Sequence, residues 1–343
     1  MVGLKFIPLN MGGVVAALLC ISSCMGGGGS ATGNDIVIDN ALESENTLTI
    51  DGQFTISKLL IADSCLAVLT QQEPYFTLYR LDDLSKVSSF GRRGRSGGEL
   101  ITEPKGVNQI GNTFQYFDHA AKALISISTT NGHVQKIPMP YNARFRPTKA
   151  ILINDATVVS GCFENGRLGY IDSNGNETIC AEDYPFPTGD ITGLQRGVKI
   201  QCELCAAPNL NRFVVRWFAS DCFEIFEVVD NSVKRLFINN FKDAPVVHGD
   251  KLSLKESSAG YIRSYVDNQF IYLMKSEDKY PDVASRGHTS KYIDVYDWDG
   301  NQVGSISLYE EIGAFCVQGN YLYAVIERVN DSIIKKIDVT DGK

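Results

Sequence analysis

From residue 34 onward, apolar and polar positions change places in short runs, with almost no helical periodicity. The runs are rich in Val, Ile, Tyr, Phe and Thr, and they stop at Asn, Asp or Gly. This pattern is typical of antiparallel strands joined by turns, so we predict an all-β protein. Representative predicted strands are Ser64–Thr70, Tyr75–Leu81, Arg212–Phe218, Phe223–Val229, Gln269–Lys275 and Tyr321–Ile326.

A weak repeat runs through these strands. Six strand-like segments end in a polar turn, and the turns begin at Asp82, Asn131, Asn174, Asp230, Asp299 and Asp341. The intervals of 49, 43, 56, 69 and 42 residues each suit one four-stranded blade. A β-sandwich would be expected to have only about seven to nine strands. The repeat therefore predicts a six-bladed β-propeller of four-stranded antiparallel blades over residues 35–343.

The sixth repeat lacks a fourth strand. Its three predicted strands are Ala314–Val317, Tyr321–Glu327 and Ser332–Val339, and the sequence then ends shortly after a turn. Two strand-like segments, Asp35–Asp39 and Thr47–Asp51, precede the first complete repeat. We expect one of them to be the outer strand of the last blade, because such closure removes an exposed pairing edge.

The first residues have a different character. Lys5 precedes an apolar stretch, Phe6–Ile21, that is short and interrupted for a membrane span and is typical of an export signal. The tetrapeptide Ile-Ser-Ser-Cys ending at Cys24 resembles the lipobox of bacterial lipoproteins. The resemblance implies cleavage before Cys24 and attachment of lipid to its sulfur. The alternatives are ordinary signal cleavage, or an uncleaved N-terminal anchor with a coincidental cysteine.

These features predict three parts: a signal peptide over 1–23, a lipidated Cys24 with a flexible tether over 24–34, and the propeller. The tether contains four consecutive glycines, Gly26–Gly29. No Asp follows Cys24 directly, so retention in an inner membrane is not signalled. We therefore expect an outer-membrane lipoprotein of the cell envelope, anchored in the lipid bilayer and facing the periplasm, with the cell surface as the alternative.

Composition and charge exclude several classes of protein. The 343 residues are 44% hydrophobic, which argues against wholesale disorder. The chain has 32 Lys and Arg against 40 Asp and Glu, a formal net charge of −8. An acidic chain is not expected to bind nucleic acid or an anionic membrane surface independently of sequence.

One glycine-rich segment carries a family resemblance. Phe90–Leu100 followed by Pro104–Val107 resembles the signature found between the blades of NHL-repeat propellers, although the signature occurs once. Together with the lipobox and the six repeats, it makes the chain similar to the TolB-like six-bladed propeller lipoproteins of the Bacteroidetes. That resemblance implies the fold and says little about activity.

The same segment is a candidate anion-binding loop, because three arginines flank its glycine amides: Arg92, Arg93 and Arg95. It lacks the Gly-Lys-Ser/Thr ending of a phosphate-binding P-loop, and no helix is predicted after it. The alternative is that the glycines allow a tight crossing between strands and the arginines are solvated.

Long predicted connections gather on one face of the ring, while the turns on the opposite face are tight. The long connections are 91–105, 139–148, 183–197, 239–261 and 276–290. Long loops on a rigid scaffold are the usual place for binding, and aromatic and Arg side chains suit a polar ligand such as a glycan or peptide. The candidate ligand-binding group is Arg144, Arg146, Arg286 and His288. The alternative is that these side chains merely pack and solvate the loops.

Signatures of catalysis are scarce. The four His form no His-x-x-x-His pair, and no Gly-x-Ser-x-Gly motif is present. Asp294, Asp297 and Asp299 resemble part of a calcium loop but alternate with strand residues. We expect no cofactor. The alternative is Ca²⁺, because six-bladed lactonases hold a metal at the funnel centre. No spacing identifies metal ligands, and we assign no catalytic residue.

The nine cysteines divide into three groups. Cys20 leaves with the signal, Cys24 would carry lipid, and seven remain in the propeller, so at least one should be unpaired within the monomer. Cys202 and Cys205 form a C-x-x-C motif, which could be redox-active or half of a zinc site. Most of the seven lie in apolar runs, where Cys acts as a small hydrophobic residue.

Two hypotheses of function remain open. The favoured one is a lipid-anchored propeller that binds a protein, peptide or glycan without performing chemistry. The alternative is a metal-dependent hydrolase or lactonase acting at the funnel.

Overall fold

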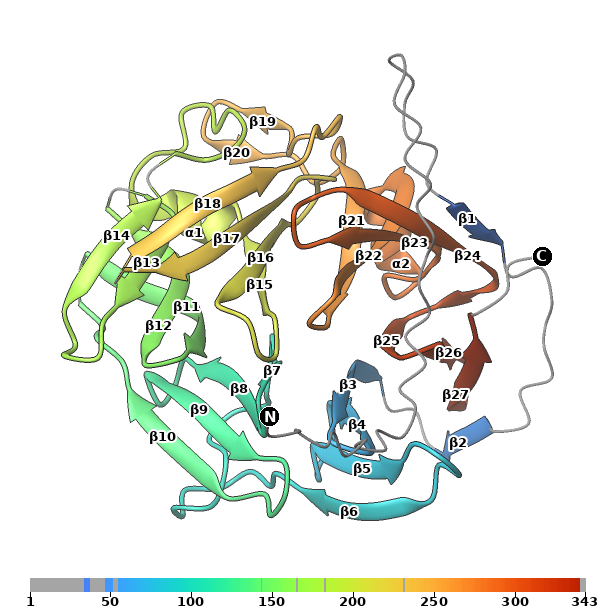
Figure 1. The fold of residues 1–343 in the computed structure, drawn as a ribbon. Coiled ribbons are helices and arrows are strands. Elements are labelled where there is room, and N and C mark those ends of the chain that lie inside the picture. Colours follow the sequence, from blue (N-terminus) through green and yellow to red (C-terminus); the bar gives the residue numbers. More distant parts are fainter. Residues whose placement is uncertain are drawn as a thin grey trace, which may run out of the picture. The chain divides into compact units, whose positions relative to one another are not determined.

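The computed structural model describes residues 34–37, 47–51, 55–142, 144–164, 166–181, 183–230 and 232–339. All of them belong to one compact unit, Gly33–Lys343. Six sheets of four or five strands form a ring (Figure 1), and we call the axis of this ring the channel; the arrangement confirms the predicted six-bladed, all-β propeller. The predicted signal peptide, Cys24 and nearly all of the tether lie outside the described residues.

The first three blades each use four consecutive antiparallel strands. Blade 1 comprises β3 (Ile56–Ala62), β4 (Cys65–Thr70), β5 (Phe76–Arg80) and β6 (Lys86–Phe90). Blade 2 comprises β7 (Asn108–Ile110), β8 (Thr113–Asp118), β9 (Ala123–Ser128) and β10 (Val134–Pro138). Blade 3 comprises β11 (Phe145–Ile153), β12 (Ala156–Phe163), β13 (Leu168–Ile171) and β14 (Glu177–Ala181).

The remaining blades complete the ring. Blade 4 comprises β15 (Cys202–Ala206), β16 (Arg212–Trp217), β17 (Phe223–Val229) and β18 (Ser232–Ile238). Blade 5 comprises β21 (Ser258–Val266), β22 (Phe270–Lys279), β23 (Ser290–Asp297) and β24 (Gln302–Ile312). Blade 6 has β25 (Ala314–Gln318), β26 (Tyr321–Glu327) and β27 (Asp331–Asp338) from the end of the chain.

The fourth strand of blade 6 comes from the other end of the chain. β2 (Thr47–Asp51) pairs antiparallel with β27, with Leu48 opposite Ile334. This confirms the predicted closure by an N-terminal strand. A second segment, β1 (Asn34–Val37), also pairs: it runs parallel to β24 and adds a fifth strand to blade 5. Both N-terminal segments therefore join the propeller, rather than one.

Burial follows the position of a strand within its blade. Every residue of β12, the second strand of blade 3, is buried, whereas the outer strands β6 and β18 contain no fully buried residue. Apolar side chains of neighbouring blades pack together in clusters, such as the one formed by blades 1 and 2. The largest cluster joins blades 5, 6 and 1 and receives Leu48 and Ile50 of β2. The core is thus divided among the blade interfaces.

Two faces of the ring differ in their connections. On the face that we call the turn face, tight turns join first to second strands, and Asp63, Gly111, Asn154 and Gly319 adopt positive φ there. On the opposite loop face lie the longer connections, with two short helices, α1 (Leu194–Lys199) and α2 (Tyr280–Ser285), and the hairpin β19 (Val247–His248) and β20 (Lys251–Leu252). Several predicted loops are shorter than expected, because β11, β21 and β22 extend into them.

Helix α1 lies against blade 3 with almost no space between the two backbones. A Cβ atom on Gly197 would come within 2.1 Å of the Gly161 carbonyl oxygen in β12. A glycine at this position therefore allows the helix to approach the sheet and cover the loop-face end of the blade.

Candidate functional site

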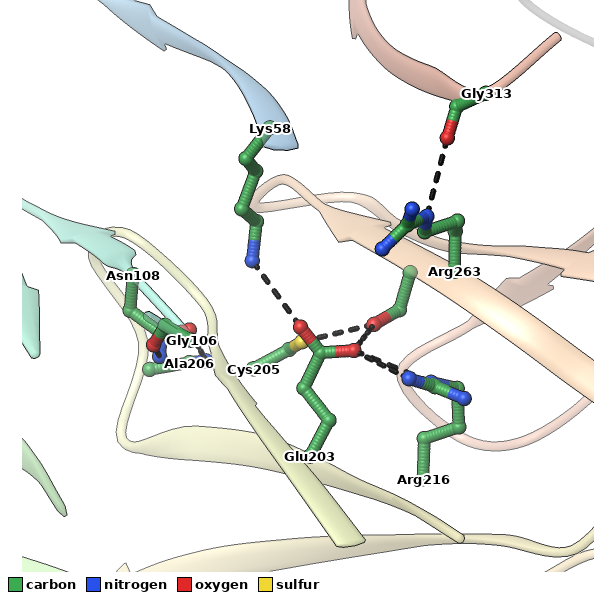
Figure 2. Close-up of polar contacts among 10 residues, drawn as sticks. Lys58, Gly106, Asn108, Glu203, Cys205, Ala206, Arg216, Arg263 and Gly313 are labelled. Atoms are coloured by element: carbon green, nitrogen blue, oxygen red, sulfur yellow. Dashed lines mark hydrogen bonds and ion pairs between the residues drawn. The ribbon is translucent and has the colours of Figure 1, made fainter. Parts of the chain in front are cut away.

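Charged side chains gather where the first strands of the blades border the channel (Figure 2). Lys58 lies on β3, Lys149 on β11, Glu203 on β15 and Arg263 on β21, and Arg216 joins them from β16. We call these five residues the channel cluster. First strands normally bury apolar side chains, so charges in them must be paired or must remain accessible to a ligand or to water.

Glu203 is the centre of the channel cluster. Its Oε1 lies 3.4 Å from Lys58 Nζ, and its Oε2 accepts hydrogen bonds from Arg216 Nη2 at 2.7 Å and Ser264 Oγ at 3.0 Å. Its side chain is 15% exposed and that of Arg216 is 2% exposed. Burial by itself would raise the pKa of Glu203, but Lys58 and Arg216 outweigh it and hold that pKa well below its ordinary value. Glu203 is therefore ionised, and both of its carboxylate oxygens have partners.

Arg263 is less completely satisfied. Its Nε donates to the Gly313 carbonyl oxygen at 3.0 Å, which leaves its two terminal nitrogens without a hydrogen bond or ion pair within the described part of the chain. Burial lowers the pKa of Arg263, and the neighbouring Arg216 lowers it further, whereas Glu203 and Glu327 oppose the shift. The guanidinium therefore loses hydration and faces a like charge without a paired carboxylate.

Lys149 is a second unmatched cation. It lies close enough to Glu203 to lower the pKa of that carboxylate. Its Nζ is 3.4 Å from the position that a Cβ on Gly106 would occupy, where φ is +62°. Among the described residues it forms no ion pair. The sum over the channel cluster is four cations against one carboxylate, in a chain whose net charge is −8.

Two half-buried histidines border the cluster. Burial lowers the pKa of His119, and Lys149 contributes in the same direction. Burial also lowers the pKa of His288, with further effects from Arg263 and Arg216. Both imidazoles are therefore neutral at pH 7 and can act as hydrogen-bond donors or acceptors.

The channel is constricted toward the turn face. The Ala206 amide donates to Asn108 Oδ1 at 3.2 Å, which joins blade 4 directly to blade 2 (Figure 2). The Gly111 amide also donates to the Pro208 carbonyl at 3.1 Å. The cavity left beside Asn108 and Ser264 has a volume of about 20 Å³, enough for roughly one water molecule. The channel cluster is therefore closed off more tightly on its turn-face side.

An apolar pocket opens on the loop face beside the channel. It has a volume of about 360 Å³ and is lined by residues of α1, the connection between β16 and β17, the connection between blades 4 and 5, and α2. Two apolar side chains at this pocket are exposed to solvent, Val198 by 61% and Leu254 by 41%. We call this the loop-face pocket.

Two aromatic residues connect the loop-face pocket to the channel cluster. The ring of Phe218 lines the pocket and lies 4.7 Å from the guanidinium carbon of Arg216. Tyr280 also lines the pocket, and its ring centroid is 5.7 Å from that of His288. Phe218 and Tyr280 therefore contact both the pocket and residues at the channel, the buried Arg216 and His288.

The structure separates the four predicted ligand-binding residues. His288 borders the channel cluster, whereas Arg286 bonds Asp278 at the end of α2. Arg144 is 83% exposed and pairs with Glu164 at 3.2 Å, and Arg146 is exposed on β11. Within the described ranges, no hydrogen bond or ion pair joins Arg144 or Arg146 to Arg286 or His288. Their role in binding stays a prediction.

The glycine-rich loop places Arg92, Arg93 and Arg95 in solvent. The Ser96 amide donates to Glu99 Oε2 at 2.9 Å, and a Cβ on Gly94 would come within 1.9 Å of the same oxygen. The carboxylate of Glu99 thus lies where the loop would receive an anion. Binding of an anion by these arginines also stays a prediction.

The C-x-x-C motif lies on β15, and both of its cysteines are buried and unpaired. Cys205 Sγ lies 3.0 Å from Ser264 Oγ. Burial raises the pKa of both thiols, which opposes formation of the reactive thiolate. All seven cysteines of the described region are free thiols.

The residues around the channel do not fit a divalent metal. The one carboxylate of the channel cluster is held by Lys58 and Arg216, and these cations would repel a metal ion. Asp297 accepts hydrogen bonds from the Asp299 and Asn301 amides, as in an ordinary turn. The described residues contain no group of three or more His, Cys, Asp or Glu arranged to hold a metal.

The channel cluster was not predicted from the sequence. Lys58, Glu203 and Arg263 each interrupt an apolar run, as in Cys202-Glu203-Leu204-Cys205. A lone charge inside a predicted first strand was the available signal. The partners Lys58 and Ser264 of Glu203 could not be identified, because they come from other blades, whereas Arg216 lies opposite Glu203 on the next strand of the same blade.

No helix in the described ranges has the length and apolar character needed to cross a membrane.

Comparison with solved structures shows the same fold. The chain is similar to a member of the DUF4221 family from Bacteroides vulgatus ATCC 8482, with a TM-score of 0.51, 10% identity, and coverage of 85% of this chain and 96% of that one. It is also similar to a protein named as exported from Bacteroides fragilis NCTC 9343, with a TM-score of 0.51, 10% identity, and coverage of 85% and 95%. At this identity the likeness shows the fold alone.

Among curated proteins, a segment of 122 residues is 28% identical to part of phosphoglucosamine mutase from Clostridium botulinum (strain Loch Maree / Type A3). The match covers 34% of this chain and 27% of that enzyme. The chain thus spans about a quarter of the enzyme's length, and we carry over no activity from it.

A sequence model of TolB-like, 6-blade propeller-like proteins matches residues 57–320, well over half of the chain. That match covers strands of all six blades and agrees with the sheet order of the structure. The chain belongs to the TolB-like six-bladed propeller family.

Proposed function

We propose that this protein is a lipid-anchored binding module of the cell envelope, and that it captures a protein, peptide or glycan on its loop face. The observation that carries the proposal is the loop-face pocket, where exposed Val198 and Leu254 line the same hollow as Phe218, whose ring lies against Arg216. An exposed apolar hollow next to concentrated charge is costly to maintain in water and typical of a binding surface.

The contrast between the two faces supports this placement. On the turn face, short turns bond to one another across blades, as in the 2.9 Å contact from the Asn209 amide to Asn268 Oδ1. On the loop face, the connections between blades 3 and 4 and between blades 4 and 5 carry α1 and the β19–β20 hairpin, and α2 joins β22 to β23 within blade 5. Variable connections on a rigid ring provide shape and chemistry for a ligand without disturbing the blades.

Anchoring through Cys24 is proposed from the lipobox-like segment at residues 21–24. The relative named as an exported protein supports an envelope location. The glycine-rich segment that follows Cys24 would then link the propeller to the lipid in the bilayer.

The lipid anchor predicts a simple labelling result. In bacteria fed an alkyne fatty acid, the wild-type protein should carry the label, and Cys24→Ala should carry none, because that thiol would be the site of lipid attachment. Cys65→Ala, a substitution in the propeller, should label like the wild type. Equal labelling of the Cys24→Ala protein would contradict the anchor.

Binding on the loop face predicts the effect of placing charge in the loop-face pocket. Peptides from a displayed library and glycans from an array would be selected on the wild-type propeller. The double variant Val198→Asp/Leu254→Asp should bind the selected ligands at least about tenfold more weakly, because buried apolar contacts are worth about 1–3 kcal/mol each.

The matched control is Val87→Asp, since Val87 is 53% exposed on the outer strand β6. It should leave binding unchanged, and both proteins should melt near the wild-type temperature. Ligands that bind the Val198→Asp/Leu254→Asp protein as tightly as the wild type would place binding elsewhere. Failure to select any ligand from either library would count against a binding module for peptides or glycans.

A further inference from the structure

A second hollow lies on the turn face and shares no lining residue with the loop-face pocket. It has a volume of about 400 Å³ and is bordered by four turns, two from blade 3 and two from blade 4. The polar residues of these turns are Asn154 and Asp155 between β11 and β12, Ser173 between β13 and β14, Asn211 between β15 and β16, and Asp230 between β17 and β18. We call this hollow the turn-face pocket.

Hydrogen bonds between the turns fix the shape of the turn-face pocket. Asn154 Nδ2 donates to Asn211 Oδ1 at 2.7 Å, which ties blade 3 to blade 4. The Val228 amide donates to the Asn211 carbonyl at 2.8 Å, which ties the first turn of blade 4 to the end of β17. The pocket is therefore formed by strand ends that are held together before any ligand arrives, as is usual for ligand sites.

The turn-face pocket carries negative charge without a counterion. The side chains of Asp155 and Asp230 are exposed, and neither carboxylate forms a hydrogen bond or an ion pair with any described residue. No Lys, Arg or His is among the residues that line the pocket in the described part of the chain. The neighbouring Arg212 is already paired with Glu227 and Asp299. The pocket therefore favours a cation.

Tyr170 provides an independent indication of a ligand. It is 4% exposed, and its ring packs in the apolar cluster between blades 3 and 4, yet it also lines the turn-face pocket. Its hydroxyl forms no hydrogen bond within the described ranges. The enclosed, unpartnered side-chain oxygens of those ranges are Tyr116 Oη and Ser258 Oγ, so the Tyr170 hydroxyl is not sealed in and opens into the pocket. An unused acceptor on a buried side chain is unusual and suits a donor that enters from outside.

The rest of the wall suits carbon. Ile153, Ala156, Val228 and Val229 line the pocket, and Val229 is 37% exposed. Covering such a wall with methylene groups removes apolar surface from water. The volume is far larger than a bare metal ion needs, and two carboxylates fall short of the three or more ligating groups sought for a metal in the described residues. An organic cation therefore fits better than a metal ion.

We propose that the turn-face pocket binds an aliphatic ammonium group, with Asp155 and Asp230 as counterions, the Tyr170 hydroxyl as a hydrogen-bond acceptor, and the methylene groups of the ligand against the apolar wall. This site is separate from the loop-face pocket and does not depend on the proposed function. A lysine side chain of a partner protein and a free amine both present this chemistry.

The test uses butylammonium, with butanoate as the probe of opposite charge and calcium chloride as the metal probe. Calorimetry on the purified protein should show saturable binding of butylammonium and none of butanoate. The affinity should fall as sodium chloride is added, because salt screens exposed carboxylates. Acetyl-lysine methylamide and diaminopentane distinguish the two sources. Tighter binding of the lysine derivative supports a protein lysine as the ligand, and tighter binding of the diamine supports a free amine.

Asp155→Asn and Asp230→Asn should each weaken butylammonium binding about fivefold, the size of one exposed ion pair, and the double variant more than about tenfold. Asn tolerates the positive φ of Asp230, so the turn is kept. Tyr170→Phe should weaken binding about threefold without lowering the melting temperature, because its hydroxyl has no described partner to lose. The matched control is Asp63→Asn, an exposed residue with φ +54° in the first turn of blade 1, which should bind like the wild type.

Four results would overturn the proposal. Absence of saturable butylammonium binding, or equal binding of butanoate, would remove the ammonium site. Wild-type affinity of the Asp155→Asn/Asp230→Asn protein would move binding away from this pocket. Calcium that binds more tightly than butylammonium, and is lost in the same double variant, would make the pocket a metal site. A folded Tyr170→Phe protein that binds like the wild type would exclude the hydroxyl as a ligand group. None of these results affects binding at Val198 and Leu254, so failure here is distinct from failure of the proposed function.

Discussion

Removing Arg167 from the interface of blades 3 and 4 will lower the stability of the propeller by about 3–5 kcal/mol, the usual cost of breaking a buried ion pair. Arg167 is 3% exposed and Glu224 is fully buried. The guanidinium bonds both carboxylate oxygens, at 2.6 and 2.8 Å. It also lies over the rings of Trp217 and Phe226, at 5.5 and 5.6 Å.

The substitution Arg167→Met keeps most of the side-chain volume but leaves a buried carboxylate with fewer partners. Trp217 Nε1 and Arg235 Nη1 still donate to Glu224, at 3.0 and 3.1 Å, so the loss is large without being complete. Differential scanning calorimetry should show a fall in melting temperature of roughly 10 °C.

A second substitution distinguishes charge from packing. Glu224→Gln added to Arg167→Met removes the unpaired charge, and the double variant should melt above Arg167→Met. The matched surface control is Arg144→Met, whose partner Glu164 is also exposed; exposed ion pairs contribute little, so it should melt like the wild type. A double variant that melts at or below Arg167→Met would show that lost packing, and not the buried charge, causes the effect.

Deleting residues 34–51 will destabilise the entire propeller, not only its last blade. The deletion removes β2 and exposes the unpaired edge of β27. It also removes Leu48 and Ile50 from the cluster that joins blades 5, 6 and 1. Each half-buried aliphatic side chain is worth about 1–2 kcal/mol, so we expect the melting temperature to fall by roughly 5–10 °C in one cooperative transition.

Smaller changes test the same closure. Leu48→Ser/Ile50→Ser should reproduce much of the effect, whereas Thr47→Ser/Thr49→Ser, on the exposed face of the same strand, should not. Deleting residues 34–37 alone should cost less, because β1 adds a fifth strand to a blade that already has four. A melting curve unaffected by the 34–51 deletion would refute the role of β2 in closing the ring.

The architecture was predictable because its signals are local. A short run of β-branched and aromatic residues such as Arg212–Phe218 indicates a buried strand, and a turn such as Asp299-Gly300 indicates where a strand ends. Counting such turns was enough to identify six blades. The missing strand of the sixth repeat also indicated that an N-terminal segment would close the ring.

The site was less predictable, because its residues are far apart in the chain and meet only in the folded ring. The same is true of the ion pair between Arg167 and Glu224. Loop length indicated which face carries the longer connections, but the loop sequences do not show which of their residues come into contact. Of the four predicted binding residues, His288 borders the channel cluster, whereas Arg144 pairs with its neighbour Glu164. Lys58 and Glu203 are 145 residues apart in the chain and meet through closure of the ring.

The sequence alone therefore determined the strands, their grouping into blades and the family resemblance, since each depends on residues close together in the chain. Tertiary structure decided that both N-terminal segments pair, that the glycine-rich loop places Glu99 against the Ser96 amide, and that Lys58 and Arg216, from different blades, meet at the carboxylate of Glu203. Those outcomes depend on distances between blades, and such distances are set by packing around the whole ring rather than by any local pattern.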